Sequence, residues 1–199
     1  MQAAKRNVFN HHSAPVVATH TVATSPRRQE AESFMRALFA RHYGAEVSTV
    51  APTLRLLEQN ERVIAATGWR PANAERLFLE RYLDMPIEQA MARLAGQPVR
   101  RERIVEVGNL AAEKSGSSVH VVVALAEHLS RLGYEWVVFT ATSELIGIFA
   151  RLGLPLLALA PADPARLGAD AAAWGNYYDT GPIVVAGRIR LALERSGRA

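Results

Sequence analysis

Residues Arg103-Ile-Val-Glu-Val-Gly-Asn-Leu110 open the part of the chain that decides the fold. Their β-branched and apolar side chains predict a strand. The segment 119–132 carries apolar residues at helical spacing and predicts a helix. Trp136-Val-Val-Phe-Thr-Ala141 is an apolar run typical of a strand buried on both faces. Strand, helix and strand therefore follow one another in the order of an α/β fold.

The same alternation continues toward the C-terminus. Ser143 is a suitable cap for a helix over 144–152, and Gly153 ends this helix before an apolar run over 154–160. Together with the first three elements this makes a strand–helix–strand–helix–strand unit. Arginines alternate with apolar residues over 183–193, which predicts that the chain ends on a strand.

The segments before residue 103 carry weaker signals. Apolar residues at helical spacing predict a helix over 32–43, and two β-rich runs flanking residues 59–61 predict a hairpin. Residues 76–83 are ambiguous between strand and helix, whereas 86–95 predict a helix that starts with a proline and ends at Gly96.

Composition excludes several classes of protein. The 199 residues include no cysteine, which excludes disulfide scaffolds, thiolate zinc sites, thiol nucleophiles and Fe–S clusters. No run approaches the ~18 apolar residues of a membrane-spanning helix. The net charge of +4 comes almost entirely from arginines, which are scattered and not interleaved with aromatic residues, so nucleic acid is an unlikely partner.

Domain boundaries and location follow from the N-terminal region. We expect a flexible tail over 1–27, a single domain over 28–195 and a short tail over 196–199. The longest apolar run of the first tail is Val16-Val17-Ala18, against the ~7–15 residues that a signal peptide needs. The expected location is therefore the cytoplasm.

The segment Glu113-Lys-Ser-Gly-Ser-Ser118 lies between a predicted strand and a predicted helix. Small residues let a ligand approach the backbone, and free N–H groups at a helix N-terminus attract phosphate. The pattern matches neither a P-loop nor a dinucleotide fingerprint, so a simple helix cap stays open beside a phosphate site.

The order of these elements, with Thr142-Ser-Glu-Leu-Ile-Gly-Ile-Phe149-Ala-Arg-Leu-Gly-Leu154, resembles the second half of GNAT-type N-acyltransferases and acyl-homoserine-lactone synthases over roughly 103–160. The resemblance implies an α/β (α+β) domain whose mixed sheet is splayed between its fourth and fifth strands, with the pantetheine arm of an acyl donor in the gap. It implies no permanently bound cofactor, and acyl-CoA or acyl carrier protein as co-substrate. The implied donor contacts are Lys114, Gly116, Ser117, Ser118, Thr140 and Thr142.

Two positions depart from that superfamily. Glu113 stands where its loop motif carries an arginine or glutamine. Phe149 stands where a tyrosine often protonates the leaving thiolate, so another acid or water must do so here.

Several uncommon motifs in order resemble a second, narrower family, the thermostable hemolysins, over roughly 28–189. The motifs are Glu106-Val-Gly-Asn-Leu-Ala111, Thr140-Ala-Thr142, Leu152-Gly-Leu154, Ala162-Asp-Pro164 and Trp174-Gly-Asn-Tyr-Tyr-Asp179. The family's name implies lysis of red cells. The sequence itself shows no export signal, long amphipathic helix or membrane-crossing hairpin.

Glu106 and Asn109 are the predicted catalytic residues. Side chains alternate along a strand, so the two face one substrate only if the strand bulges, as GNAT-type strands often do. Between Val105 and Val107, Glu106 is either a base of raised pKa or the partner of an arginine such as Arg103.

The segment 174–179 joins two tyrosines, an amide and a carboxylate to a Trp-Gly turn. This composition suits a polar-rimmed aromatic pocket for a small acceptor. Packing over the sheet edge would explain Trp174 and Tyr177 but explains the polar residues poorly. The candidate acceptor residues are Trp174, Asn176, Tyr177, Tyr178 and Asp179.

The hypothesis is therefore an N-acyltransferase that moves an acyl group from acyl-CoA or acyl carrier protein to a small amine, with Glu106 removing a proton and Asn109 and Thr140 orienting the thioester. No histidine pair has metal-site spacing and no Gly-x-Ser-x-Gly elbow occurs, so we predict neither a metal nor a serine hydrolase. Two alternatives stay open: a cytolytic, membrane-active protein and a non-catalytic acyl-ligand binder.

Overall fold

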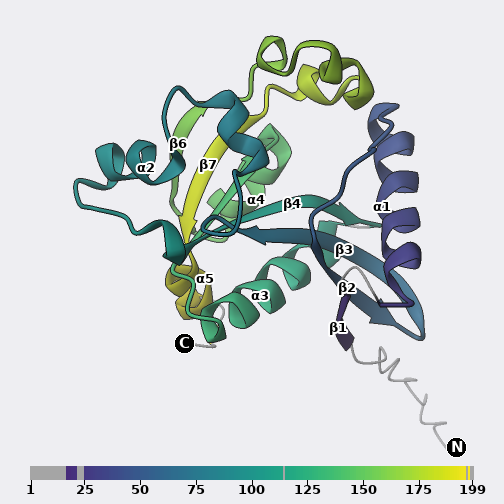
Figure 1. Cartoon of the computed structure of the whole chain (residues 1–199). Coiled ribbons are helices and arrows are strands. Elements are labelled where there is room, and N and C mark those ends of the chain that lie inside the picture. The colour runs from purple at the N-terminus through teal and green to yellow at the C-terminus, as the bar shows by residue number, and fades with distance from the viewer. Residues whose placement is uncertain (1–16, 22–24, 114, 196, 198–199) are drawn as a thin grey trace, which may run out of the picture.

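A computed structural model describes residues 17–21, 25–113, 115–195 and 197. Within them, seven strands form one mixed sheet in the order β1-β2-β3-β4-β5-β7-β6 (Figure 1). Most of the predicted N-terminal tail lies outside the described residues. β1 (Val17–Thr21) falls inside the predicted tail and pairs antiparallel with β2. Such pairing uses backbone groups, so it leaves little hydrophobic pattern in the sequence.

The predicted hairpin is confirmed as β2 (Thr53–Gln59) and β3 (Arg62–Pro71). Its turn residues Asn60 and Glu61 both have positive φ, as a two-residue turn of this hand requires. Helix α1 (Arg28–Tyr43) packs on this hairpin and buries Ala31, Met35, Leu38 and Phe39. It begins four residues before the predicted Glu32, because ion pairs of Glu32 with Arg28 and Arg36 stabilise a polar first turn.

The segment between β3 and β4 is mostly helical. The ambiguous residues 76–83 contain a 3-10 helix, η1 (Phe78–Tyr82), and the predicted helix after them is α2 (Ile87–Ala95). A short 3-10 turn, η2 (Arg101–Arg103), precedes β4. η1 matters for the site because its backbone N–H groups point to the sheet.

The C-terminal half has the predicted alternation. It comprises β4 (Ile104–Ala112), α3 (Ser115–Arg131), β5 (Trp136–Ala141), α4 (Ser143–Arg151), β6 (Leu156–Pro161), the 3-10 segments η3 (Pro164–Trp174) and η4 (Tyr177–Thr180), β7 (Ile183–Arg188) and α5 (Ile189–Arg195).

Three details of this half correct the sequence analysis. Helix α3 begins at Ser115 and not at 119, so the end of the predicted loop belongs to its first turn. The N-cap of α4 is Thr142 and not Ser143, because the Thr142 hydroxyl accepts the Leu145 N–H. The last predicted strand turns into α5 after Arg188, where Ile189 and Leu193 are buried at i, i+4 spacing.

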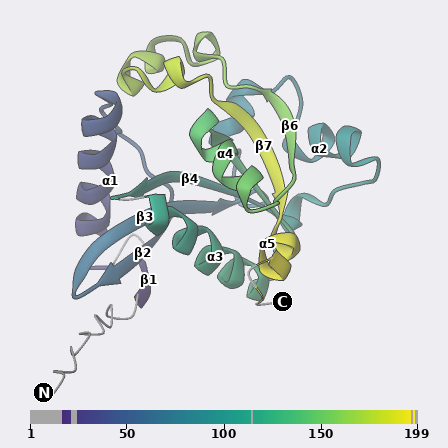
Figure 2. The same ribbon diagram turned by 180° about the vertical axis from the view of Figure 1, so that it is seen from behind.

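β4 and β5 run parallel and separate after a short contact. Their register holds from Ile104 opposite Trp136 to Glu106 opposite Val138, although both strands continue further. The predicted splaying between these strands is confirmed. Helix α1, η1 and η3 cover one face of the sheet, whereas α3, α4 and α5 cover the other (Figures 1 and 2).

Candidate active site

A cavity of about 430 Å³ passes through the gap between β4 and β5. On the face covered by α1 and η1 it is lined by Glu106, Arg70, Asn109 and aromatic rings. On the opposite face it is lined by apolar side chains of α3, α4 and α5. The separation of two strands that would otherwise pair therefore connects a polar chamber with an apolar arm.

Glu106 lies at the centre of the polar chamber and is only 7% exposed. Its carboxylate accepts the N–H groups of Phe78 and Leu79 in η1, at 2.9 and 3.0 Å. Burial raises its pKa above the ordinary value, even though these two donors and Arg70 act in the opposite direction. The result is a buried carboxylate that two hydrogen bonds hold in place, with increased proton affinity.

The arginine beside Glu106 is Arg70 of β3 and not Arg103. Arg70 Nε lies 3.4 Å from a Glu106 oxygen, and its Nη1 lies 3.3 Å from Glu75. Arg103 instead donates to the Gly133 carbonyl. Glu106 thus has an arginine partner and also lines the cavity, and its role as a base stays a prediction.

Asn109 reaches the cavity through a β-bulge. Between Gly108 and Ala111 strand β4 advances three residues while β3 advances two, from Gly68 to Ala66. Asn109 has a positive φ of 53°, a conformation that asparagine tolerates better than most residues. Its side-chain oxygen accepts the Ala51 N–H at 3.3 Å, on the face where Ala111 packs against α1. The predicted bulge therefore brings Asn109 to the side of Glu106.

Aromatic rings form another part of the cavity wall. Trp174 packs against Phe39 and Phe78, with ring centroids 6.3 and 5.8 Å apart, and Tyr177 meets Tyr43 edge to face at 5.3 Å. All five rings line the cavity. Burial raises the pKa of Tyr177 above its ordinary value.

Gly175 brings this aromatic wall against the end of α1. A Cβ at this position would lie 1.9 Å from the Tyr43 carbonyl oxygen, and φ is 54°. The next residue, Asn176, donates its N–H to the same oxygen at 2.9 Å. No other residue type fits here without moving the backbone.

The structure does not bring every predicted acceptor residue to the cavity. Asn176 and Asp179 are exposed and do not line it. Tyr178 lines a neighbouring cavity of about 760 Å³, and its hydroxyl lies 2.6 Å from that of Tyr82. Tyr82 borders both cavities.

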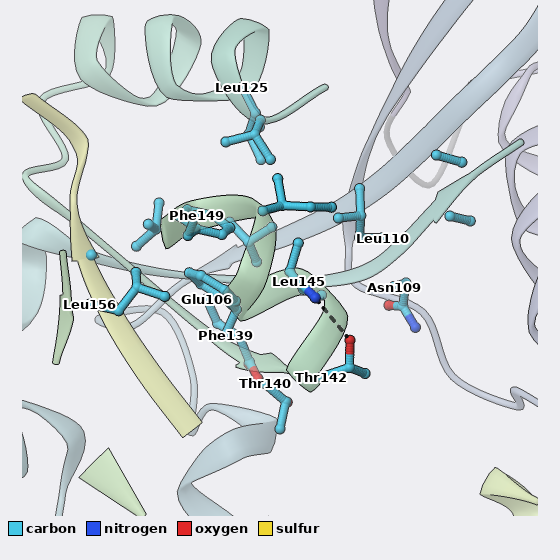
Figure 3. Close-up of a pocket in the computed structure, with 18 of the residues that line it drawn as sticks. Glu106, Asn109, Leu110, Leu125, Phe139, Thr140, Thr142, Leu145, Phe149 and Leu156 are labelled. Carbon is cyan, nitrogen blue, oxygen red and sulfur yellow. Dashed lines mark hydrogen bonds between the residues drawn. The ribbon is translucent and has the colours of Figure 1, made fainter. Parts of the chain in front are cut away.

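The predicted donor contacts divide in a similar way. Thr140 and Thr142 line the cavity, and Thr142 also caps α4 (Figure 3). Gly116, Ser117 and Ser118 lie in the first turn of α3, where N–H groups have no partner within the helix. Lys114 lies outside the described residues. Glu113, the acid in place of the superfamily's donor, pairs with Arg62 at 2.7 Å.

The apolar arm lies beneath β5. Leu125 of α3, Leu145 and Phe149 of α4 and Leu156 of β6 converge on it (Figure 3). Phe149 packs on Phe139 with ring centroids 5.1 Å apart. The residue that replaces the superfamily's tyrosine is therefore part of an apolar wall.

Sequence reasoning missed Arg70 and the rings of Phe39, Tyr43, Phe78 and Tyr82. Arg70 gave one usable signal, a charged residue directly after the buried Trp69 in a predicted strand. The aromatic residues gave none, since their spacing in the sequence is that of ordinary core residues.

Metal sites and membrane spans are two further features to consider. Among the described residues, no three histidine, aspartate or glutamate side chains gather as metal ligands would. In the same part of the chain, no helix combines the length and the apolar character that crossing a bilayer requires.

A mixed sheet opened between β4 and β5, with a cavity through the opening, is the GNAT-like fold of acyl-homoserine-lactone (AHL) synthases. Within proteins of this general architecture, the chain belongs to the thermostable hemolysin family, whose model matches residues 21–193. Both resemblances inferred from the sequence are confirmed. A search of curated proteins found no match.

Solved structures agree with this fold. The AHL synthase LasI is 12% identical, with 91% of this chain and 95% of that chain covered and a TM-score of 0.62. FeeM, an N-acyl amino acid synthase from uncultured soil microbes, is 14% identical, with 92% and 96% covered and a TM-score of 0.59. BjaI, a CoA-dependent AHL synthase solved with SAM and isopentyl-CoA, is 14% identical, with 92% and 90% covered and a TM-score of 0.61. At these identities the likeness is one of fold.

Proposed function

We propose that the protein is an N-acyltransferase that moves an acyl group from a thioester donor to a small amine. The observation that carries this proposal is the continuity of the cavity, which joins the carboxylate of Glu106 to an apolar arm through the gap between β4 and β5. The arm suits an acyl chain and the polar chamber suits an amine. A thioester lying in the gap would have its carbonyl carbon beside Glu106.

The reaction is a nucleophilic substitution at the thioester carbonyl. The amine nitrogen forms a bond to the carbonyl carbon, the C–S bond breaks, and the amine proton passes to Glu106 directly or through one water. The thiolate leaves and takes a proton from water. The raised pKa of Glu106 supports its role as the base, because a carboxylate of ordinary pKa is a weaker proton acceptor.

Acyl-CoA or acyl carrier protein is the proposed donor, and its phosphates would lie at the first turn of α3, where Gly116, Ser117 and Ser118 offer backbone N–H groups. BjaI is described with isopentyl-CoA and FeeM as an N-acyl amino acid synthase, which supports the donor and the amine acceptor. Acyl-CoA and acyl carrier protein are both found in the cytoplasm, so we place the activity there.

The test is thiol release from acyl-CoA in the presence of a panel of amines, with the N-acyl product identified by mass spectrometry. We expect turnover by the wild type and its loss in Glu106→Gln, while Glu75→Gln, which removes the exposed carboxylate on the other side of Arg70, keeps it. If the donor binds saturably but no product forms with any amine, whether the donor is acyl-CoA or acyl carrier protein, the result would favour the non-catalytic acyl-ligand binder.

The family description favours a second candidate, membrane lysis. Dye release from liposomes by purified protein measures it directly. If Glu106→Gln releases dye as well as the wild type does, lysis is a property separate from the cavity. Absence of leakage at micromolar protein would leave acyl transfer as the supported function.

A further inference from the structure

We propose, on the basis of the acyl-transfer function above, that Gly187, Leu191 and Ala192 form the end wall of the apolar arm and set the longest acyl chain that the protein accepts. All three residues line the cavity. They come from the end of β7 and from α5, the last helix of the chain. The wall is thus built by a different segment from the residues that line the polar chamber around Glu106.

The sheet register places this wall at the end of the arm. The arm follows β5 from Phe139, which packs against α4, toward Val137. Val137 is opposite Gly187, and Gly187 is also opposite Leu156. Helix α5 begins two residues after Gly187, beside α3 (Figure 2). A chain lying along β5 therefore meets α5 next.

Gly187 leaves room where any other residue would fill it. A Cβ there would lie 3.1 Å from Leu156 Cδ2 and 3.7 Å from Val137 Cγ2, both of which belong to residues lining the arm. Its backbone is not in the left-handed region, so conformation alone does not demand glycine. The absence of a side chain here widens the arm between two apolar neighbours.

Helix α5 is supported from behind. Ile189 and Leu193 are buried against Leu129 of α3, on the same cluster as Leu125. Arg195 lies over Gly153, where a Cβ would be 3.6 Å from its Cζ. The helix is therefore held at both its core side and its C-terminal end, which makes it a fixed wall. Ala192, small and partly buried, is the position at which added volume shortens the arm.

The experiment measures the affinity of straight-chain acyl-CoAs, from acetyl to palmitoyl, by isothermal titration calorimetry. In the wild type, affinity increases about fourfold for each methylene buried until the chain reaches the wall, and then stops increasing. Ala192→Phe and Gly187→Ala move this limit to shorter chains, and Leu191→Ala moves it to longer ones. Affinity for acetyl-CoA stays the same in all three variants.

Arg190→Ala is the matched control. Arg190 is on the same helix, its side chain is 79% exposed, and it forms an ion pair with Glu194. We expect the wild-type limit from it. If Ala192→Phe does not fold, the other two variants still test the proposal, because Gly187→Ala should shorten the longest accepted chain and Leu191→Ala should lengthen it. An unchanged limit in the folded variants, or an equal loss of affinity at every chain length, overturns the end wall while leaving acyl transfer intact. Absence of binding at any chain length, both for acyl-CoAs and for acyl carrier protein loaded with the same chains, overturns the donor site as well.

Discussion

Two buried glutamates on the same side of the sheet have opposite environments. Glu80 and Glu106 are 5% and 7% exposed. Glu80 accepts the N–H groups of Leu77 and Ile87 and pairs with Arg101 at 2.6 Å. Glu106 accepts two N–H groups of η1, and its arginine is further away, at 3.4 Å.

The pKa values differ accordingly. Burial acts to raise the pKa of Glu80, but Arg101 and the two N–H donors outweigh it and lower the pKa to about 2. Burial dominates at Glu106, whose pKa is raised. Glu80 does not line the cavity between β4 and β5, whereas Glu106 does. Burial alone thus does not mark a candidate functional carboxylate; incomplete charge compensation beside a cavity does.

Replacing Glu106 should have the largest effect. Glu106→Gln keeps the size of the side chain and removes the base, so we expect turnover to fall by about 10²–10⁴-fold. Donor affinity should change little, because the proton transfer occurs only during the reaction. Steady-state kinetics with separate measurement of acyl-CoA binding tests this. Equal turnover in the variant would remove Glu106 from the mechanism.

The corresponding change at Glu80 should affect stability instead of chemistry. Glu80→Gln removes the buried partner of Arg101, which retains its ion pair with Glu88, and should lower the free energy of unfolding by about 3 kcal/mol. Urea denaturation at neutral pH measures this loss. At low temperature, where the variant is folded, its turnover should match the wild type. A loss of turnover comparable to that of Glu106→Gln would contradict the division of roles.

The stability of the wild type should depend on pH through Glu80. Its folded pKa of about 2 is below the ordinary 4.5, so its stabilising contribution is complete above pH 4.5 and is lost as pH falls toward 2. The loss should be about 3 kcal/mol across that window. Urea midpoints of the wild type and Glu80→Gln, measured from pH 5 downward, should converge. Parallel curves would show that Glu80 has no lowered pKa.

The smallest effect concerns Arg70. Its charge lowers the pKa of Glu106, so Arg70→Gln should raise that pKa further. As the pH is lowered, activity that needs the ionised base would then be lost at a higher pH. The acidic limb of the pH–rate profile therefore shifts to higher pH. Glu75→Gln, which leaves the Arg70 charge in place, should not move it upward. An unchanged acidic limb in Arg70→Gln would show that the 3.4 Å contact is electrostatically unimportant.

The fold was largely predictable because its central elements carry strong periodic signals. Residues 104–112 and 136–141 are apolar β runs and 115–131 is an amphipathic helix, so their types and order could be inferred from spacing. The prediction of a strand was wrong for the residues after Arg188, which form α5. Alternating arginines there suggested a strand, but the i, i+4 pairs Ile189–Leu193 and Arg190–Glu194 fit a helix equally well.

The candidate site was predictable only in part. Glu106, Asn109 and Trp174 stood in distinctive motifs, and the cavity contains all three. The backbone donors of η1 and the guanidinium of Arg70 reach Glu106 through tertiary packing, across 28 and 36 positions of sequence. Nearly every residue type carries a backbone N–H group, so the sequence could not indicate this part of the site.

The most direct test of the central claim is a crystal structure with a thioether analogue of a long-chain acyl-CoA, which cannot transfer its chain. We predict that the sulfur lies in the gap between β4 and β5 beside Glu106, and that the alkyl chain runs between Phe139 and Phe149 toward Ala192. A chain bound outside the cavity, or no bound analogue at saturating concentration, would contradict the account.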